Sequence, residues 1–365
     1  MRKSIVKLYT VLLIATVLAG IFAACSANGS GKQSQSAANS TASSLENNSN
    51  ENRQGANTWT PVQFIDFSSK HNVMIKNDDG SLTPMDVPYF KSTLIAPGTW
   101  QILSDGDYSY LVEGDNEAIL IDSGYGAGNI REYCQSLTQK PLKYVVNTHY
   151  HFDHTANNAY FDCAYMSADT KPNATIPSPS FAGINFPRDY PTVIIGEGYK
   201  FQLGNRELEV FEIPNHTAGG IALLDRRERI LFSGDEIMAS KGVHLNCSVA
   251  QFEQNMSKLA AHRSEFDKCF GGPGILDATA VDKYLATAQH ILSGQGTPQK
   301  MQFNMGGLLG QSQVSADSSA QKVYVRRRPH PADMGDMLAK LANEYLVQMT
   351  YDDCTITYDS RRIKN

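Results

Sequence analysis

The feature that most constrains this 365-residue chain is a cluster of histidines near its middle. The stretch Thr148–His154 reads Thr-His-Tyr-His-Phe-Asp-His and contains three of the nine histidines. Four of its side chains can bind a metal: His149, His151, Asp153 and His154. The preceding segment, Lys143–Asn147, is β-branched and aromatic, which predicts a buried strand. Because imidazole nitrogen and carboxylate oxygen are ligands of zinc and similar ions, the motif predicts a metal site where this strand ends.

Two further candidate ligands lie downstream of the motif. His216 stands in the sequence Ile-Pro-Asn-His-Thr, and Asp235 ends the sequence Phe-Ser-Gly-Asp. The segments before them, Glu207–Ile213 and Arg229–Phe232, both have the pattern of a strand. Ligands that follow strands can converge from distant parts of a chain onto one edge of a fold.

The motif and these two later residues resemble the metallo-β-lactamase superfamily. Its members carry His-x-His-x-Asp-His, then a histidine usually written Pro-Gly-His-Thr, and then a Gly-Asp pair. The agreement in order and spacing extends over roughly residues 91–295. The resemblance implies an α+β (four-layer α/β) fold, the αββα metallo-β-lactamase sandwich. Composition and periodicity alone support only a mixed α and β protein.

The resemblance also implies roles for the candidate residues. A first metal would be held by the imidazoles of His149, His151 and His216, and a second by Asp153 and His154, with Asp235 bridging the two. Three imidazoles leave a position open for water, which on zinc has a pKa of about 7. The resulting hydroxide would attack a carbonyl or phosphoryl centre, and Asp153 would orient it and move its proton. We expect one or two zinc ions, with iron and manganese as alternatives.

One ligand of the second metal is missing. A further histidine normally follows the last family strand in a Pro-Gly-His-Gly context, and this chain has Gly271 and Gly272 there. Three alternatives follow: a weak second site completed by water, a one-metal enzyme, or replacement by another residue. His244, which lies in the loop after Asp235, is the candidate substitute.

We expect a hydrolase that acts on a small ester, thioester, lactone or related substrate. Zinc β-lactamases of the superfamily generally lack the bridging aspartate, which is Asp235 here, so these substrates are favoured over a β-lactam and a β-lactamase is kept as an alternative. A second alternative is a lipoprotein that binds a metal or ligand on the same scaffold without catalysis, because of the missing histidine.

Residues 1–24 have the features of a bacterial targeting segment: three positive charges, an apolar run and small residues before Cys25. The sequence Ile21–Cys25 resembles a lipobox, so we expect Cys25 to carry a lipid that anchors the protein on the outer face of the cytoplasmic membrane. A secreted protein and an uncleaved membrane anchor are the alternatives. Loss of residues 1–24 changes the formal net charge from −5 to −8, which argues against nucleic acid as a partner. The expected partners are a small-molecule substrate and the membrane.

The expected domain organisation has four parts: a signal peptide (1–24), a flexible tether (25–57), a metallo-β-lactamase-like domain (58–295) and an accessory C-terminal region (296–365). The tether is rich in Ser, Asn, Gln, Ala and Gly and has little to bury. Five prolines between residues 171 and 191 exclude a regular element and predict a loop that walls the substrate site.

Periodicity also predicts individual elements. Further strands are expected at Thr99–Leu103, Tyr108–Glu113, Glu117–Asp122 and Gly220–Leu224. Helices are expected at Asn129–Leu137, after a capping Ser248 and after a capping Asp277. The final segment predicts a hairpin of Val347–Tyr351 and Cys354–Tyr358.

Overall fold

The computed structural model describes residues 59–62, 73–76, 81–84, 90–104, 107–126, 128–177, 185–238, 242–271, 274–300, 322–325 and 345–364. All of them belong to one compact unit of the chain, residues 57–365. The targeting segment, the lipidation site Cys25, the tether and Gly272 lie outside the described residues. Within the described ranges, no helix is long and apolar enough to cross a membrane.

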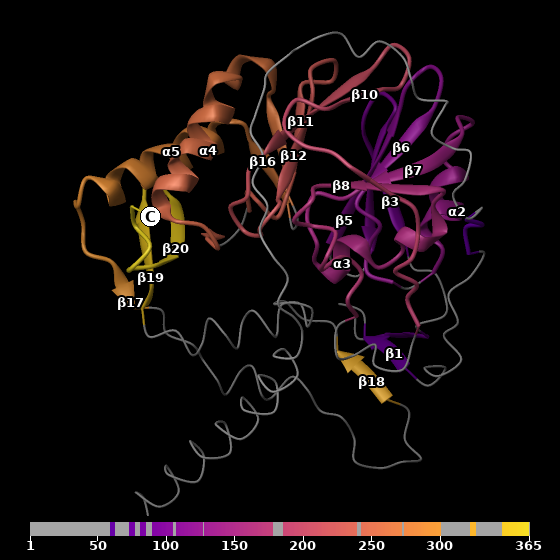
Figure 1. Ribbon diagram of the computed structural model, residues 1–365, viewed down its shortest axis with the longest axis horizontal. Coiled ribbons are helices and arrows are strands. Elements are labelled where there is room, and N and C mark those ends of the chain that lie inside the picture. Colours follow the sequence, from indigo (N-terminus) through magenta and orange to yellow (C-terminus); the bar gives the residue numbers. More distant parts are fainter. Residues whose placement is uncertain are drawn as a thin grey trace, which may run out of the picture. The chain divides into compact units, whose positions relative to one another are not determined.

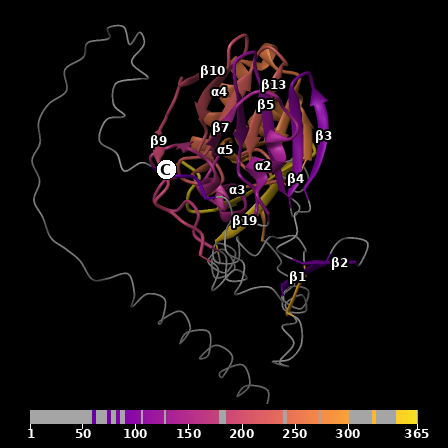
Figure 2. The ribbon, with the colours of Figure 1, turned by 90° about the vertical axis from the view of Figure 1, so that its right-hand side faces the viewer.

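The first half of the domain is a seven-stranded sheet. Its strands follow one another in the order of the chain: β3 (Lys91–Ala96), β4 (Thr99–Ser104), β5 (Asp107–Glu113), β6 (Ala118–Ile121), β7 (Leu142–Val146), β8 (Cys163–Met166) and β9 (Thr192–Ile194). The strands β3 to β6 are antiparallel, and β6 to β9 are parallel. Figure 2 shows the two end strands, β3 and β9, on opposite sides of the molecule.

The second half is a six-stranded sheet, also in chain order except that β14 belongs elsewhere. Its strands are β10 (Lys200–Gln202), β11 (Glu207–Glu212), β12 (Ile221–Asp225), β13 (Ile230–Gly234), β15 (Lys268–Gly271) and β16 (Gly274–Asp277). The hairpin that leads to His216 is formed by β10 and β11, and the hairpin that leads to Asp235 by β12 and β13.

Three hydrophobic cores separate four layers. In β5, Tyr110 and Val112 pack between the two sheets, whereas Leu111 packs on the opposite face, as the alternation of a strand requires. That opposite face is covered by α2 (Ile130–Gln135) and α3 (Phe152–Thr155). The outer face of the six-stranded sheet is covered by α4 (Val249–Ala261) and α5 (Thr279–Leu292), which Figure 1 shows on the far side from α2. The expected αββα fold is confirmed.

The C-terminal hairpin forms as predicted, from β19 (Leu346–Tyr351) and β20 (Cys354–Asp359). It joins β14 (Val243–His244) and β17 (Gln299–Lys300) in a four-stranded sheet. Its apolar side chains share one core with α4 and α5, so the hairpin completes the second helical layer. A further sheet contains β1 (Val73–Lys76), β2 (Leu82–Pro84) and β18 (Lys322–Val325).

The N-termini of α4 and α5 test the two predicted capping residues, Ser248 and Asp277. Ser248 caps α4 by accepting a hydrogen bond from the Gln251 amide at 3.1 Å. The Gln251 side chain does not return the bond as it would in a capping box, because it donates to Asn255 Oδ1. Asp277 accepts from the amide of Thr279 at 2.8 Å, but the N-cap position of α5 is one residue later than predicted. Two short 3₁₀ turns, Asn158–Tyr160 and Arg263–Glu265, complete the described helices.

A buried arginine joins the two sheets. Arg206, in the turn between β10 and β11, donates from Nε to Asp225 Oδ2 on β12 at 2.7 Å. Its other nitrogens donate to Thr99 Oγ1 at 2.6 Å and to the carbonyl oxygens of Gly98 and Glu113, all in the seven-stranded half. The Arg206 and Asp225 side chains are 2 % and 0 % exposed, so each charge depends on the other.

We expect Arg206→Met to destabilise the fold by about 3–5 kcal/mol, because it leaves the Asp225 charge buried without its partner. The double variant with Asp225→Leu should recover much of this loss. Urea unfolding of the full chain measures both. The control is Arg229→Met, which breaks an exposed pair with Asp267 and should have a much smaller effect. Equal losses for the two single variants would contradict this role of Arg206.

Candidate metal centre

The histidine motif lies at the carboxyl ends of two parallel strands. β6 and β7 pair with Ile121 opposite Val146, so Asp122 and residues 147–154 leave the sheet at the same edge. The predicted strand before the motif is β7. The chain then enters α3, for which His151 is the N-cap residue. The sequence thus delivers its four motif side chains within one tight, buried turn.

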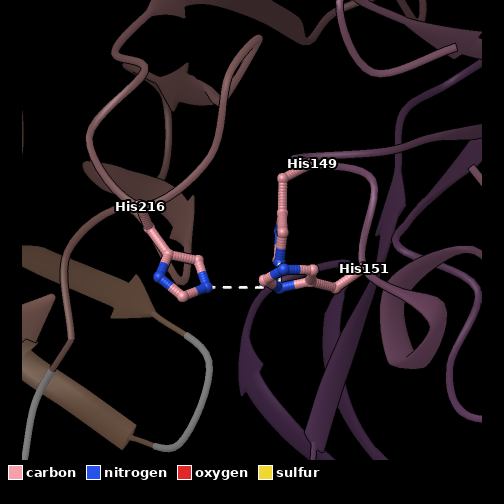
Figure 3. A group of neighbouring side chains, drawn as sticks. All are labelled: His149, His151 and His216. Carbon is pink, nitrogen blue, oxygen red and sulfur yellow. Dashed lines mark hydrogen bonds between the residues drawn. The ribbon is translucent and has the colours of Figure 1, made fainter. Parts of the chain in front are cut away.

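Three imidazoles meet at this edge, as Figure 3 shows. His149 and His151 come from the loop after β7, and His216 comes from the loop between β11 and β12. Nε2 of His149 and Nε2 of His216 lie 3.0 and 3.2 Å from Nδ1 of His151. One ring nitrogen either donates or accepts a single hydrogen bond and cannot satisfy both neighbours. A cation shared by the three nitrogens satisfies all of them, so these residues fit a metal ion.

A second group surrounds His154. Its Nε2 lies 3.7 Å from Asp153 Oδ2 and 3.7 Å from Asp235 Oδ1. Nε2 makes no hydrogen bond although the side chain is 1 % exposed, and 3.7 Å is beyond hydrogen-bonding distance. His149, His154 and Asp235 offer ligand atoms within 4.8 Å of one another. All six residues that the sequence singled out as ligands are therefore brought to one edge, in two adjoining groups.

A glycine precedes Asp235 for a steric reason. Gly234 has a φ of 50°, and a Cβ at this position would lie 2.2 Å from Thr148 Oγ1. Only glycine allows the end of β13 to approach the histidine loop this closely. The close approach carries Asp235 from the six-stranded half of the domain to the motif on the seven-stranded half.

Asp122 is a functional residue that the sequence reasoning did not identify as one. Its carboxylate accepts hydrogen bonds from the amide and hydroxyl of Thr148, both at 2.7 Å, and contacts Nδ1 of His154 at 2.8 Å. The contact fixes the ring so that Nε2 faces Asp153 and Asp235. Asp122 also has a φ of 60°. The available signal was an acidic residue directly after the apolar run 118–121 and before Ser-Gly.

Glu236 holds the loop that presents His216. Its carboxylate accepts hydrogen bonds from the amides of Asn215 and His216, both at 2.6 Å, and from the Thr217 hydroxyl at 2.8 Å. Burial raises the pKa of Glu236 to about 7, although these hydrogen bonds oppose the shift. The residue was missed because nothing local in the sequence distinguishes it from a surface glutamate.

Asn215 stands where the family pattern usually has glycine. Its side chain donates to the backbone oxygen of Glu236 at 3.1 Å and accepts from Nδ2 of Asn255 in α4 at 2.8 Å. The substitution therefore ties the His216 loop to a helix of the outer layer.

Electrostatics differ between the two groups. Burial, with help from the other imidazoles, lowers the pKa of His149 well below its usual value, which favours the neutral ring that binds a metal. Burial also opposes a charge on His154, but Asp122, Asp153 and Asp235 outweigh it and raise the pKa of His154 well above its usual value.

The structure places the remaining candidates differently. His244 enters none of the ligand groups found among the described residues, because β14 pairs with β20 in the C-terminal sheet. Cys247 and Cys269, which lie near the motifs in sequence and could ligate a metal as thiolates, are free thiols outside those groups, and burial raises the pKa of each to about 12. A third group joins Asp107, which the sequence reasoning did not consider, to Asp153 and His154 within 4.8 Å.

The described parts of the proline-rich segment, residues 171–177 and 185–191, contain no helix or strand, as predicted. Thr175 is tied to α3, since its amide donates to Thr155 Oγ1 at 2.8 Å and its hydroxyl donates to the Thr155 oxygen at 2.7 Å. Arg188 donates to the oxygens of Ala174 and Pro172. This segment is therefore anchored to the helix that carries Asp153 and His154.

Comparison with known proteins gives a consistent family. Residues 105–273, which include all six ligand candidates, match the model of the Metallo-beta-lactamase superfamily. The acyl-coenzyme A thioesterase MBLAC2 of Homo sapiens is 31% identical over 160 residues, covering 35% of this chain and 57% of that protein. The probable metallo-hydrolase MJ0888 of Methanocaldococcus jannaschii is 29% identical over 184 residues, covering 46% and 86%. A metallo-beta-lactamase from Pontibacter korlensis has a TM-score of 0.45 at 18% identity, covering 55% of this chain and 99% of the other.

The family match confirms the expected metallo-β-lactamase fold over the matched residues, and the two relatives are named as a thioesterase and a probable metallo-hydrolase, the class of enzyme expected from the sequence. The chain spans little more than half the length of the human thioesterase, so this similarity by itself assigns no substrate.

We expect Asp122→Asn to weaken metal binding by about 10–100-fold, the usual effect of losing the outer partner of a ligand histidine. The asparagine amide can donate to Nδ1 of His154, which places the ring hydrogen on Nε2 and blocks that ligand atom. Competition with a chelator measures the affinity. Asp115→Asn, in the exposed turn after β5, is the control, and an unchanged affinity in Asp122→Asn would contradict the role.

Metal binding to the metal-free protein at pH 7 should release about one proton, because His154 holds a proton there that its Nε2 must lose to bind a cation. His149, whose pKa is lowered, contributes none. Calorimetric titration with zinc in two buffers of different protonation enthalpy counts the protons. His154→Gln should abolish the release, and an equal release from this variant would assign the proton to another group.

Proposed function

We propose that the protein is a metal-dependent hydrolase of small esters, thioesters or lactones, and that thioesters are the favoured class. The observation that carries the proposal is the convergence of two adjoining ligand groups on one buried edge, one made of three imidazoles and the other mixing His154 with carboxylates. A structural metal site needs only one closed set of four ligands. Two adjoining, incompletely closed groups are the arrangement of a reacting centre.

Zinc is the ion we propose, and when bound it supplies a Lewis acid and a nucleophile derived from water at neutral pH. The residues of the chain do the rest. Asp153, at 4 % exposure, lies beside His154 and is positioned to accept a proton from the attacking water and pass it to the leaving group. Asp122 and Glu236 hold His154 and His216 in place, so little reorganisation accompanies the reaction.

Two observations support the substrate class. Asp235 stands within the group of His149 and His154, and this bridging aspartate distinguishes the esterase-like branches of the family resemblance from the zinc β-lactamases. The human relative, which shares 31% identity over the matched region, is named as an acyl-coenzyme A thioesterase. Since that match covers part of each chain, the acyl group and the leaving thiol are left open in the proposal.

The location that we propose is the outer face of the cytoplasmic membrane, through a lipid on Cys25. It rests on the targeting features of residues 1–24 and on the lipobox-like sequence that ends at Cys25. A tether of about thirty polar residues would then separate the hydrolase domain from the membrane surface.

The test is turnover by the zinc-loaded full chain of a substrate panel: a short acyl-coenzyme A, an aryl ester, a lactone, a β-lactam and a phosphodiester. We expect hydrolysis of the thioester or ester, loss on chelation and recovery with zinc. Asp153→Asn should lower kcat by about 10²–10⁴, the usual contribution of a general base, while Asp169→Asn, an exposed acid on the same half, should not.

The same substrate panel distinguishes the two alternative functions. Turnover of the β-lactam alone would identify a β-lactamase instead. Bound metal without turnover of any substrate would favour a protein that binds a metal or ligand without catalysis.

A further inference from the structure

We propose that Asp107 is a ligand of the second metal ion and takes the place of the late histidine that this chain lacks. The inference rests on the proposed metal-dependent function, which it deepens by completing the second site. It replaces the candidate suggested by the sequence, His244, whose strand lies in the C-terminal sheet.

The sheet topology brings Asp107 to the site. β5 is antiparallel to β6, with Tyr110 opposite Ile121. The first residue of β5 therefore lies at the edge where β6 ends, next to Asp122 and the histidine loop. Asp107 is that first residue, and it is half-buried there. One carboxylate oxygen of Asp107, one of Asp153 and a ring nitrogen of His154 all lie within 4.8 Å of one another.

The imidazole in this group is oriented as a ligand. Nε2 of His154 is buried without a hydrogen bond and faces carboxylate oxygens of Asp153 and Asp235 at 3.7 Å. Two donors that share a tetrahedral ion at about 2.1 Å are about 3.4 Å apart, close to the distances seen here. Asp107, Asp153 and Asp235 each lie within ligand distance of His154, so one nitrogen and three carboxylates are available, the number of donors that zinc requires.

The charges agree with this count. Asp107, Asp153 and Asp235 place three negative charges at one edge, two of them almost fully buried. Burial of like charges together is unfavourable unless a cation or a proton compensates them. Two divalent ions would carry four positive charges and outweigh the three carboxylates by one, whereas a single ion leaves one negative charge in excess.

One of the two glycines at the usual position of the missing ligand, Gly271, has no room for a side chain. The end of β15 lies so close to the segment that follows β13 that a Cβ at Gly271 would lie 2.3 Å from the carbonyl oxygen of Ile237 and 3.1 Å from that of Gly234. No side chain fits there without a backbone shift. A carboxylate from β5 reaches the same second group from the other sheet.

The test is cobalt binding by the full chain. Wild type should take up two Co²⁺ per chain. Asp107→Asn should retain the first ion and lose the second, because its affinity for the second ion should fall by more than the roughly 10–100-fold that loss of an outer hydrogen-bond partner causes. Circular dichroism of the metal-free variants confirms folding. Asp115→Asn, the same change in the exposed turn at the other end of β5, should bind two ions.

A second variant reports contact with the metal directly. In Asp107→Cys, a thiolate bound to Co²⁺ gives a sulfur-to-metal charge-transfer band that is absent from wild type. Asp115→Cys should give none. Two tightly bound ions in Asp107→Asn, a single ion in wild type, or no new band in a folded Asp107→Cys would each overturn the assignment.

These outcomes are separate from the proposed function. A wild type that binds two ions and hydrolyses nothing would refute the hydrolase and leave Asp107 as a ligand. Conversely, an active Asp107→Asn with two ions would refute the ligand and leave the hydrolase.

Discussion

The metal centre depends above all on the buried carboxylate of Asp122. At 1 % exposure this charge is unfavourable unless donors surround it, and it meets both hydrogen-bonding groups of Thr148 and Nδ1 of His154. These contacts join the end of β6 to the loop after β7, so the two strands and the ligand loop form one rigid unit. The strained φ of 60° at Asp122 is maintained by the same contacts. The spacing of the motif histidines brings their ring nitrogens together only because this loop conformation is fixed.

The structure divides the ligands between the two halves of the domain. The motif histidines and Asp153 belong to the seven-stranded half, and His216 and Asp235 belong to the six-stranded half. Each of the two later ligands is placed by a contact specific to its loop. The His216 amide donates a hydrogen bond to the Glu236 carboxylate, and the close packing of Gly234 on Thr148 places Asp235. The site is therefore a property of the assembled sandwich, and no single segment of the chain forms it.

Much of this was readable from the sequence because it depends on local patterns. The strands before each ligand, the cap at Ser248 and the turn at Asp352 and Asp353, both with positive φ, are encoded within a few residues of where they act. The residues that were missed are single acids whose partners are distant. Asp122 meets Thr148 across 26 positions and Glu236 meets Asn215 across 21, and Asp107 reaches the site only through the pairing of β5 with β6. His244 shows the opposite case. It is near Asp235 in the sequence, but the pairing of β14 with β20 places it in the C-terminal sheet.

The two halves are held together at both ends of the sandwich, by different means. Arg206 contacts Glu113 at the end of β5, whereas Asp107 and the ligand groups lie at the beginning of that strand. One edge is thus closed by a permanent ion pair, whereas the other carries more carboxylates than the protonated His154 can balance until a cation binds. Because a cation bound by ligands from both halves favours the assembled state, its binding energy adds to folding energy at that edge alone. Removal of the metal should loosen the edge where the substrate reacts while Arg206 preserves the sandwich, so the fold can tolerate a site with an excess of negative charge.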